Sequence, residues 1–153
     1  MALDWGYQEG KVTTMNETDQ RLQLPLLILR ITIGLFMLQW GVEKFVLPDT
    51  AANIFSHFYG IDGLTQNFSY ILGVLQCLVA LSVLAGFQKR ISYALAFLIH
   101  SVSTISTIPR MLAPYEPGNH LFFTGVPVLA GMFLLWYLRD SDTKFSLDAR
   151  NKG

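Results

Sequence analysis

Four stretches of the chain are long, apolar and almost free of charge. Residues 67–88, 91–109 and 117–138 contain no Asp, Glu, Lys or Arg, and residues 22–46 carry only Arg30 near their start and Glu43 and Lys44 near their end. Each stretch is close to the length of about 20 residues that a helix needs to cross the hydrocarbon of a bilayer. The pattern predicts four membrane-spanning helices, over about residues 24–46, 67–86, 91–108 and 120–138.

The predicted helices lack the polar stripe that a soluble bundle needs. Residues 71–85 and 126–137 are apolar on all sides, whereas each helix of a soluble four-helix bundle carries a polar face. The predicted fold class is therefore an all-α bundle of four transmembrane helices, formed by residues 22–138. Polar segments flank it at 1–21 and 139–153, and both are expected to be loosely ordered.

A short helix is expected in the first loop, between the first two spans. Asp49 or Thr50 is placed to cap it, and Gly60 follows its expected end near Tyr59. Its apolar face would hold Ile54, Phe55 and Phe58. The pattern is typical of an interfacial helix that lies on the outer leaflet or caps the bundle.

The distribution of basic residues predicts the orientation. Lys89 and Arg90 fill the turn between the second and third spans, and most of the other basic residues lie in the two terminal segments. The positive-inside rule then places this turn and both termini in the cytoplasm. We expect an integral protein of a bacterial inner membrane, with the loops 47–66 and 109–119 outside.

Composition agrees with a membrane protein and excludes several other classes. Hydrophobic residues make up 52% of the chain and charged residues only 14%, with a mean hydropathy of +0.39, against about 25% charge in a typical soluble domain. Eleven basic residues balance eleven acidic ones, so no nucleic-acid partner is expected. The single cysteine, Cys77, excludes a disulfide framework within one chain, and no metal site is expected.

Polar residues inside the spans are the candidates for function, because each is costly in hydrocarbon unless it is paired. They gather in the outer halves of the predicted helices. This pattern predicts a polar pocket that opens outward, with His100 and Gln76 at its floor and Glu43, Arg110 and His120 at its mouth. The candidate ligand-binding residues are Gln39, Glu43, Gln76, His100, Thr104, Thr107, Arg110 and His120.

Several of these residues also have a purely structural interpretation. Arg30 either pairs inside the bundle or extends to lipid phosphates, Glu43 and Lys44 could form an interfacial ion couple, and Gln76 could join two helices. A mid-span histidine favours functional use most strongly, which singles out His100. Haem held by His100 and His120 is not expected, because the two residues lie at different depths.

The first span also resembles a known family. The segments 29–36 and 39–45 are similar to the opening helix of DoxX/DoxD-like membrane proteins, in which an Arg, two Gly and a Lys recur. Arg30, Gly34, Gly41 and Lys44 occupy those positions here. The resemblance implies four spans and an association with membrane redox complexes, since members include the small membrane subunit of a thiosulfate:quinone oxidoreductase. Related eukaryotic proteins are assembly factors for membrane receptors.

Three functions follow from these observations, and catalytic residues stay unassigned in all of them. The first is a subunit of a quinone-linked redox complex whose outer pocket takes a quinone head group. The second is a non-enzymatic accessory or assembly subunit that packs against a larger membrane complex, or against copies of itself. The third is passage of a small solute along the polar face of the third span, which the apolar inner half disfavours.

Overall fold

The computed structural model describes residues 17–63 and 65–150, and these residues form helices joined by short turns. Helix α1 is the longest, with 30 residues. The helical elements are α1 (Glu17–Val46), α2 (Pro48–Tyr59), α3 (Gln66–Ala85), α4 (Lys89–Ser106), α5 (Ile108–Met111), the 3₁₀ helix η1 (Asn119–Thr124), α6 (Gly125–Tyr137) and α7 (Leu147–Arg150).

Three helices in the described part of the chain are long and apolar enough to cross a membrane. They are α1, α3 and the continuous stretch Asn119–Tyr137 that η1 and α6 form. They correspond to the first, second and fourth predicted spans, and they confirm the all-α membrane fold. The fourth span is not one regular α-helix, because its first turns are 3₁₀ and α6 begins only at Gly125. Pro127 therefore lies in the first turn of α6, where its missing N–H has no helical partner to lose.

Helix α4 corresponds to the third predicted span but is less apolar, because Lys89, Arg90, His100 and several Ser and Thr residues interrupt it. Its buried face holds Ser92, Tyr93, His100 and Thr104. Its exposed face holds Ile91, Leu95, Leu98, Ile99, Val102 and Ile105. A helix of a soluble protein buries its apolar side chains and exposes its polar ones, and α4 shows the reverse distribution. This arrangement agrees with the prediction that α4 also lies in the membrane.

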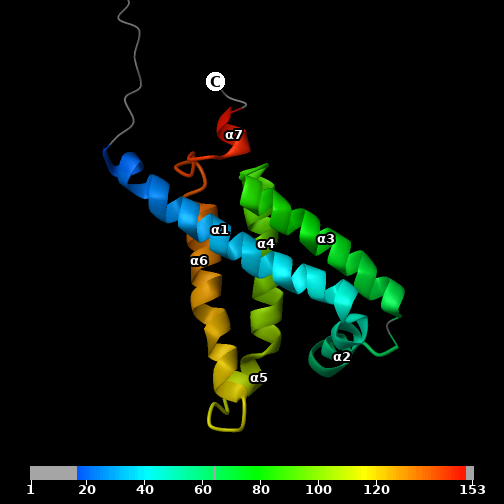
Figure 1. Ribbon diagram of the computed structural model, residues 1–153. Helices are drawn as coiled ribbons and strands as arrows, with labels where there is room; N and C mark the ends of the chain where they lie inside the picture. The colour runs from blue at the N-terminus through cyan, green and yellow to red at the C-terminus, as the bar shows by residue number, and fades with distance from the viewer. Residues whose placement is uncertain (1–16, 64, 151–153) are drawn as a thin grey trace, which may run out of the picture.

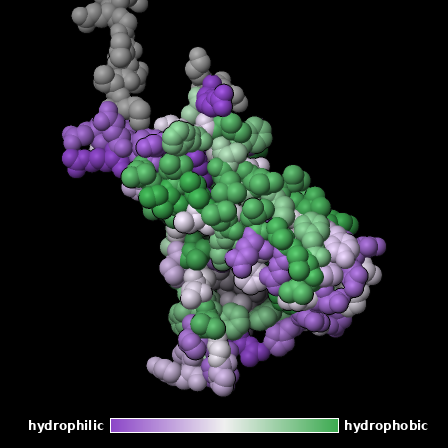
Figure 2. All heavy atoms as spheres, in the orientation of Figure 1, coloured by the Kyte–Doolittle hydropathy of each residue, from purple (hydrophilic) through white to green (hydrophobic). Residues whose placement is uncertain are grey.

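The helices form two pairs that cross (Figure 1). Helices α1 and α3 run side by side, and so do α4 and α6. The pairs approach each other where α7 and the start of α1 lie, and they diverge toward α2 and α5. We call the first region, with residues 86–93 and 139–150, the tail end, and the second, with residues 43–59 and 107–125, the loop end. Figure 2 shows that apolar residues cover much of the surface between the two ends.

Small residues allow α1 and α3 to pack closely. A Cβ atom at Gly34 would lie 2.5 Å from Cγ of Leu84, and one at Gly41 would lie 2.7 Å from Sγ of Cys77. Close backbone approach through glycine is the usual way in which membrane helices associate. The buried core between the two pairs consists of Leu26, Ile33, Met37, Ala80, Val83, Tyr93, Ala96, Met132 and Leu135.

The predicted interfacial helix is present as α2, but its capping differs from the expectation. Pro48 occupies its first turn, the cap position is Leu47, and neither Asp49 nor Thr50 caps it with a side chain. Proline suits the first turn because its nitrogen needs no acceptor there. Gly60 ends the helix in the left-handed conformation (φ +65°), as predicted.

The C-terminal segment corrects a prediction. Residues 139–150 were expected to be a loosely ordered tail, but they fold back across the tail end of the bundle, and Asp142 and Ser146 are fully buried there. Residues 17–21 of the N-terminal segment are also ordered, since α1 begins at Glu17 and Ser141 donates to the Asp19 carboxylate at 2.9 Å; residues 1–16 lie outside the described part. The physical reason for the order in residues 139–150 is Arg30, whose buried charge needs a counter-ion.

Candidate functional site

The most completely buried polar group of the described chain is an ion pair at the tail end. Arg30 of α1 and Asp142 have side chains that are 1% and 0% exposed, and Nη1 of Arg30 lies 3.0 Å from Oδ1 of Asp142. Nη2 of Arg30 also donates to the carbonyls of Lys144 and Phe145, at 2.8 and 3.2 Å. Of the two interpretations of Arg30, the structure therefore shows the paired, buried one.

Helix α4 completes this cluster. The Tyr93 hydroxyl donates to Oδ2 of Asp142 at 2.6 Å, and Nζ of Lys89 donates to the main-chain carbonyl of Asp142 at 2.6 Å. Burial lowers the pKa of Lys89 below its usual value, and the neighbouring Asp142 carboxylate partly opposes this. Nearly every buried donor is satisfied, although Nε of Arg30 has no partner among the described residues. We call Arg30, Lys89, Tyr93 and Asp142 the tail-end cluster.

The turn between α3 and α4 is tied to the same segment. Gly86 adopts φ +60°, and a Cβ atom there would lie 2.8 Å from Nη1 of Arg30. Ser146 donates to the Gly86 carbonyl at 2.9 Å, and the Asp148 carboxylate accepts the main-chain N–H groups of Gln88 and Lys89 at 2.8 and 2.9 Å. Asp148 thus caps the start of α4 from the C-terminal segment.

The four residues that carry the family resemblance have structural roles. Arg30 belongs to the tail-end cluster, and Gly34 and Gly41 lie where α1 meets α3. Nζ of Lys44 donates to Oε1 of Gln76 at 2.9 Å and to the Trp40 carbonyl at 3.0 Å. Because Nε2 of Gln76 also donates to the Met37 carbonyl at 3.1 Å, Gln76 joins α1 to α3 rather than facing a pocket.

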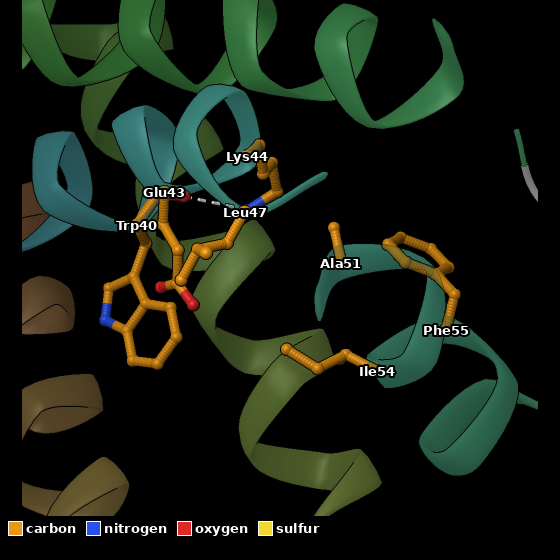
Figure 3. Close-up of a pocket in the computed structure, with 7 residues that line it drawn as sticks. All are labelled: Trp40, Glu43, Lys44, Leu47, Ala51, Ile54 and Phe55. Carbon is orange, nitrogen blue, oxygen red and sulfur yellow. Dashed lines mark hydrogen bonds between the residues drawn. The ribbon is translucent and has the colours of Figure 1, made fainter. Parts of the chain in front are cut away.

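A small cleft lies at the loop end, between α1 and α2 (Figure 3). It has a volume of about 40 Å³ and is lined by Trp40, Glu43, Lys44, Leu47, Ala51, Ile54 and Phe55. Trp40 and Glu43 descend from α1 on one side, and Ile54 and Phe55 of α2 lie across from them. Of the eight predicted ligand-binding residues, Glu43 is the one that lines this cleft. Its carboxylate makes no hydrogen bond or ion pair within residues 17–63 and 65–150.

His100 and Thr104 form a second polar position, between α4 and α6. Nε2 of His100 donates to the Gly125 carbonyl at 3.0 Å, and the His100 ring meets Phe36 of α1 edge-on at 5.4 Å. Thr104 is 9% exposed, and its hydroxyl has no hydrogen-bond partner in the described chain. Phe36 in turn contacts Trp40, at 6.4 Å between ring centres, so Phe36 touches both His100 and a residue that lines the cleft, whereas His100 itself does not line it.

The remaining predicted residues lie apart from both positions. Thr107 bonds back to the carbonyl of Thr104, and His120 is exposed on η1. Nη2 of Arg110 donates to Nε2 of His57 at 2.7 Å, which joins α5 to α2. The structure therefore distributes the predicted pocket residues over several separate places on α1, α3, α4 and the loop end, and His57, which was not among the predicted site residues, is the partner of Arg110.

Gln39 has a different position from the rest. It is exposed on α1, and its amide makes no hydrogen bond to any residue that the structure describes. The helix face around it carries exposed Ile28, Ile31, Leu35 and Val42. We call these five residues the free face of α1. The neighbouring Thr32 is also exposed, but its hydroxyl bonds to the carbonyls of Ile28 and Leu29.

Sequence reasoning missed the tail-end cluster, apart from naming Arg30. The available signal was a charge without a partner inside a predicted span, together with two aspartates, Asp140 and Asp142, soon after the fourth span. No group of three or more His, Cys, Asp or Glu among residues 17–63 and 65–150 is placed to hold a metal ion.

Comparison with known proteins gives one match. The sequence model of the DoxX family matches residues 25–109, which cover more than half of the chain and extend from α1 to the start of α5. No curated protein matches the chain, and no solved structure does. The matched region includes Arg30, Gly34, Gly41 and Lys44 but ends before the C-terminal segment that pairs with Arg30.

Proposed function

The chain belongs to the DoxX family of membrane proteins, and from that premise we propose that it is an accessory membrane subunit that packs the free face of α1 against a helix of a larger membrane complex. The observation that carries the proposal is Gln39. Its side-chain amide lies on an exposed helix face that is apolar apart from the self-bonded Thr32, and it has no partner within the described residues.

The energetic argument concerns what an amide does in hydrocarbon. Transfer of an amide from water to a medium without hydrogen bonds costs several kcal/mol, roughly 4–8 in the least polar solvents. Glutamine on a membrane helix therefore favours association with another helix that offers a polar group, worth about 1–2 kcal/mol per pair in model peptides. Thr32 on the same side of α1 needs no such partner, because its own helix satisfies its hydroxyl.

The resemblance suggests which complex to test first. Members of the DoxX family include a subunit of a quinone-linked oxidoreductase, so the proposed partner is a membrane-bound redox enzyme with a polar side chain at the depth of Gln39. A second copy of the chain would present its own Gln39, which makes a homo-oligomer the competing outcome.

Extraction in a mild detergent from native membranes tests the proposal. We expect the wild-type chain to be recovered in a particle larger than a monomer that contains a second membrane protein in fixed ratio. Gln39→Leu should dissociate that particle, while Thr32→Val, the matched control on the same side of α1, should leave it intact. Recovery of the wild type as a monomer, or an unchanged particle for Gln39→Leu, would contradict the proposal.

Quinone binding by this chain is a second candidate, favoured by the cleft and by Thr104. The cleft has the apolar and aromatic walls that suit a quinone head group, with the Glu43 carboxylate as its polar group. The Thr104 hydroxyl is an unused donor beside His100. A volume of about 40 Å³ is below the roughly 300–1,000 Å³ of small-molecule pockets, so binding requires α2 to move away from α1.

This requirement gives the candidate its own test. Phe58 of α2 contacts Phe122 of η1, with ring centres 6.0 Å apart. The two positions can therefore be cross-linked to hold α2 in place, with a bifunctional maleimide that joins Phe58→Cys to Phe122→Cys. A Cys77→Ser background removes the native thiol. Decylubiquinone should quench Trp40 fluorescence, read in a Trp5→Phe, Trp136→Phe background, before cross-linking and not after it. The absence of quenching in the free protein would contradict quinone binding.

Passage of a small solute has the least support among the three functions. Any route along α4 would have to pass the tail end, where Arg30, Tyr93 and Asp142 fill the interior.

A further inference from the structure

A charged basin lies at the tail end, beside the tail-end cluster. Its volume is about 410 Å³, within the range of small-molecule sites. The start of α4 and the C-terminal segment line it, so two parts of the chain that are distant in sequence form one concave surface. The basin is lined by Lys89, Arg90, Arg139, Asp140, Thr143, Asp148 and Ala149.

Asp148 and Lys89 of the basin are already engaged, whereas Asp140 is only weakly paired. Both carboxylate oxygens of Asp148 accept main-chain N–H groups of α4, and the Lys89 ammonium donates inward to the Asp142 carbonyl. The Asp140 carboxylate is 85% exposed and lies 3.8 Å from Nη2 of Arg139, a separation at which an exposed pair is weak.

The two arginines are different. Arg90 is exposed and makes no hydrogen bond or ion pair within the described chain. Arg139 is held in place, because its Nη1 donates to the Trp136 carbonyl at 3.0 Å and its guanidinium lies 5.4 Å from the centre of the Trp136 ring. The Arg90 side chain is therefore free to move toward a ligand, and the Arg139 guanidinium is already oriented by Trp136.

We propose that the tail-end basin binds the phosphate group of an acidic phospholipid, through Arg90 and Arg139. A guanidinium presents paired N–H donors that match two phosphate oxygens, and it binds phosphate better than an ammonium does in such a position. The proposal does not depend on the accessory role or on any partner protein.

The surroundings favour a lipid over a soluble phosphate compound. Phe87, Ile91 and Tyr137 are exposed, and each lies within two residues of a basin residue or next to the Trp136–Arg139 contact. Basic pockets at the cytoplasmic ends of membrane helices are typical sites for acidic head groups. The predicted orientation, with the C-terminus inside, places the basin at the cytoplasmic leaflet, where acidic lipids interact with basic residues.

Titration of the delipidated, detergent-solubilised full chain with phosphatidylglycerol tests the proposal. We expect the melting temperature of the wild type to rise with phosphatidylglycerol and not with phosphatidylcholine of the same acyl chains. Arg90→Gln should raise the dissociation constant at least about tenfold, as expected for the loss of a charged hydrogen bond. Since the Arg90 side chain is exposed and makes no hydrogen bond or ion pair with residues 17–63 and 65–150, this variant should keep the wild-type melting temperature without lipid.

Lys144→Gln is the matched control, because Lys144 is an exposed basic residue of the same segment that does not line the basin. It should bind phosphatidylglycerol as the wild type does. If phosphatidylglycerol raises the melting temperatures of the wild type and of Arg90→Gln equally, the proposed site is wrong. If phosphatidylglycerol and phosphatidylcholine raise the melting temperature of the wild type equally, the head-group charge plays no role and the proposal is also wrong. Binding of inorganic phosphate as tight as that of the lipid would assign the basin to a soluble anion and overturn the lipid.

Discussion

The tail end and the loop end treat their polar groups in opposite ways. At the tail end, Arg30, Lys89, Tyr93 and Asp142 are buried, and Asp142 of the C-terminal segment bonds to the other three, so that Nε of Arg30 is the one side-chain atom of this cluster left without a partner in the described chain. At the loop end, the Glu43 carboxylate has no hydrogen-bond partner in the described chain, and neither the Thr104 hydroxyl nor the Gln39 amide, on the adjoining parts of α4 and α1, has one either.

The difference indicates which polar residues serve the fold and which are available for binding. A buried charge is tolerated when its counter-ion and hydrogen bonds are complete, and loss of one partner then destabilises the protein strongly. A polar group that the fold leaves without a partner contributes little to stability. We therefore expect substitutions at the tail end to reduce stability, and substitutions at the loop end to affect binding with little loss of stability.

The largest effect is expected for Asp142→Ala. This substitution leaves the Arg30 guanidinium buried without its counter-ion and should lower the free energy of unfolding by about 3–5 kcal/mol. Reversible unfolding in mixed detergent micelles measures the change, and Asp140→Ala, whose carboxylate is 85% exposed, is the control. A loss of less than 1 kcal/mol for Asp142→Ala would contradict the claim that the buried ion pair at the tail end stabilises the fold.

A smaller loss is expected for Tyr93→Phe, which removes one hydrogen bond to the same carboxylate and keeps the ion pair. Hydrogen bonds to charged groups contribute about 1.5–3 kcal/mol, and the same unfolding assay should show a loss in that range. If the loss equals that of Asp142→Ala, the tyrosine holds the C-terminal segment as firmly as the arginine does.

A loss of about 1 kcal/mol is expected for Gln76→Leu, in which Lys44 loses one of its two acceptors. Ser82→Ala is a suitable control, because the Ser82 hydroxyl bonds to the Leu78 carbonyl of its own helix and to no other helix of the described chain. Equal stabilities of the two variants would show that Gln76 does not join α1 to α3 in the membrane.

The smallest effect is expected for Thr104→Val, which removes a buried hydroxyl that has no partner. Replacement by a methyl group of similar shape should change the free energy of unfolding by less than about 0.5 kcal/mol, or raise it. Thr107→Val, which loses a bond to the Thr104 carbonyl, provides the comparison. A cost above 1 kcal/mol for Thr104→Val would mean that the hydroxyl is satisfied in the folded protein.

Local sequence patterns predicted the helices, because apolar runs and glycine positions determine helices over short distances. They could not identify the partner of Arg30, since Asp142 lies 112 positions later in a segment that looks like an ordinary polar tail. The candidate pocket shows the same limit. The i, i+4 spacing of His100 and Thr104 placed both on one face of α4, but the packing of the helices decides that His100 meets Phe36 of α1 and that neither His100 nor Thr104 lines the cleft.

Photo-cross-linking in native membranes tests the central claim most directly. A photoreactive amino acid at position 39, on the free face of α1, should form a covalent adduct of one defined mass with a membrane protein. The same group at position 75, where Leu75 is an exposed apolar residue of α3, should label lipid. Lipid adducts alone from position 39 would contradict the claim that the amide of Gln39 is satisfied by a protein partner.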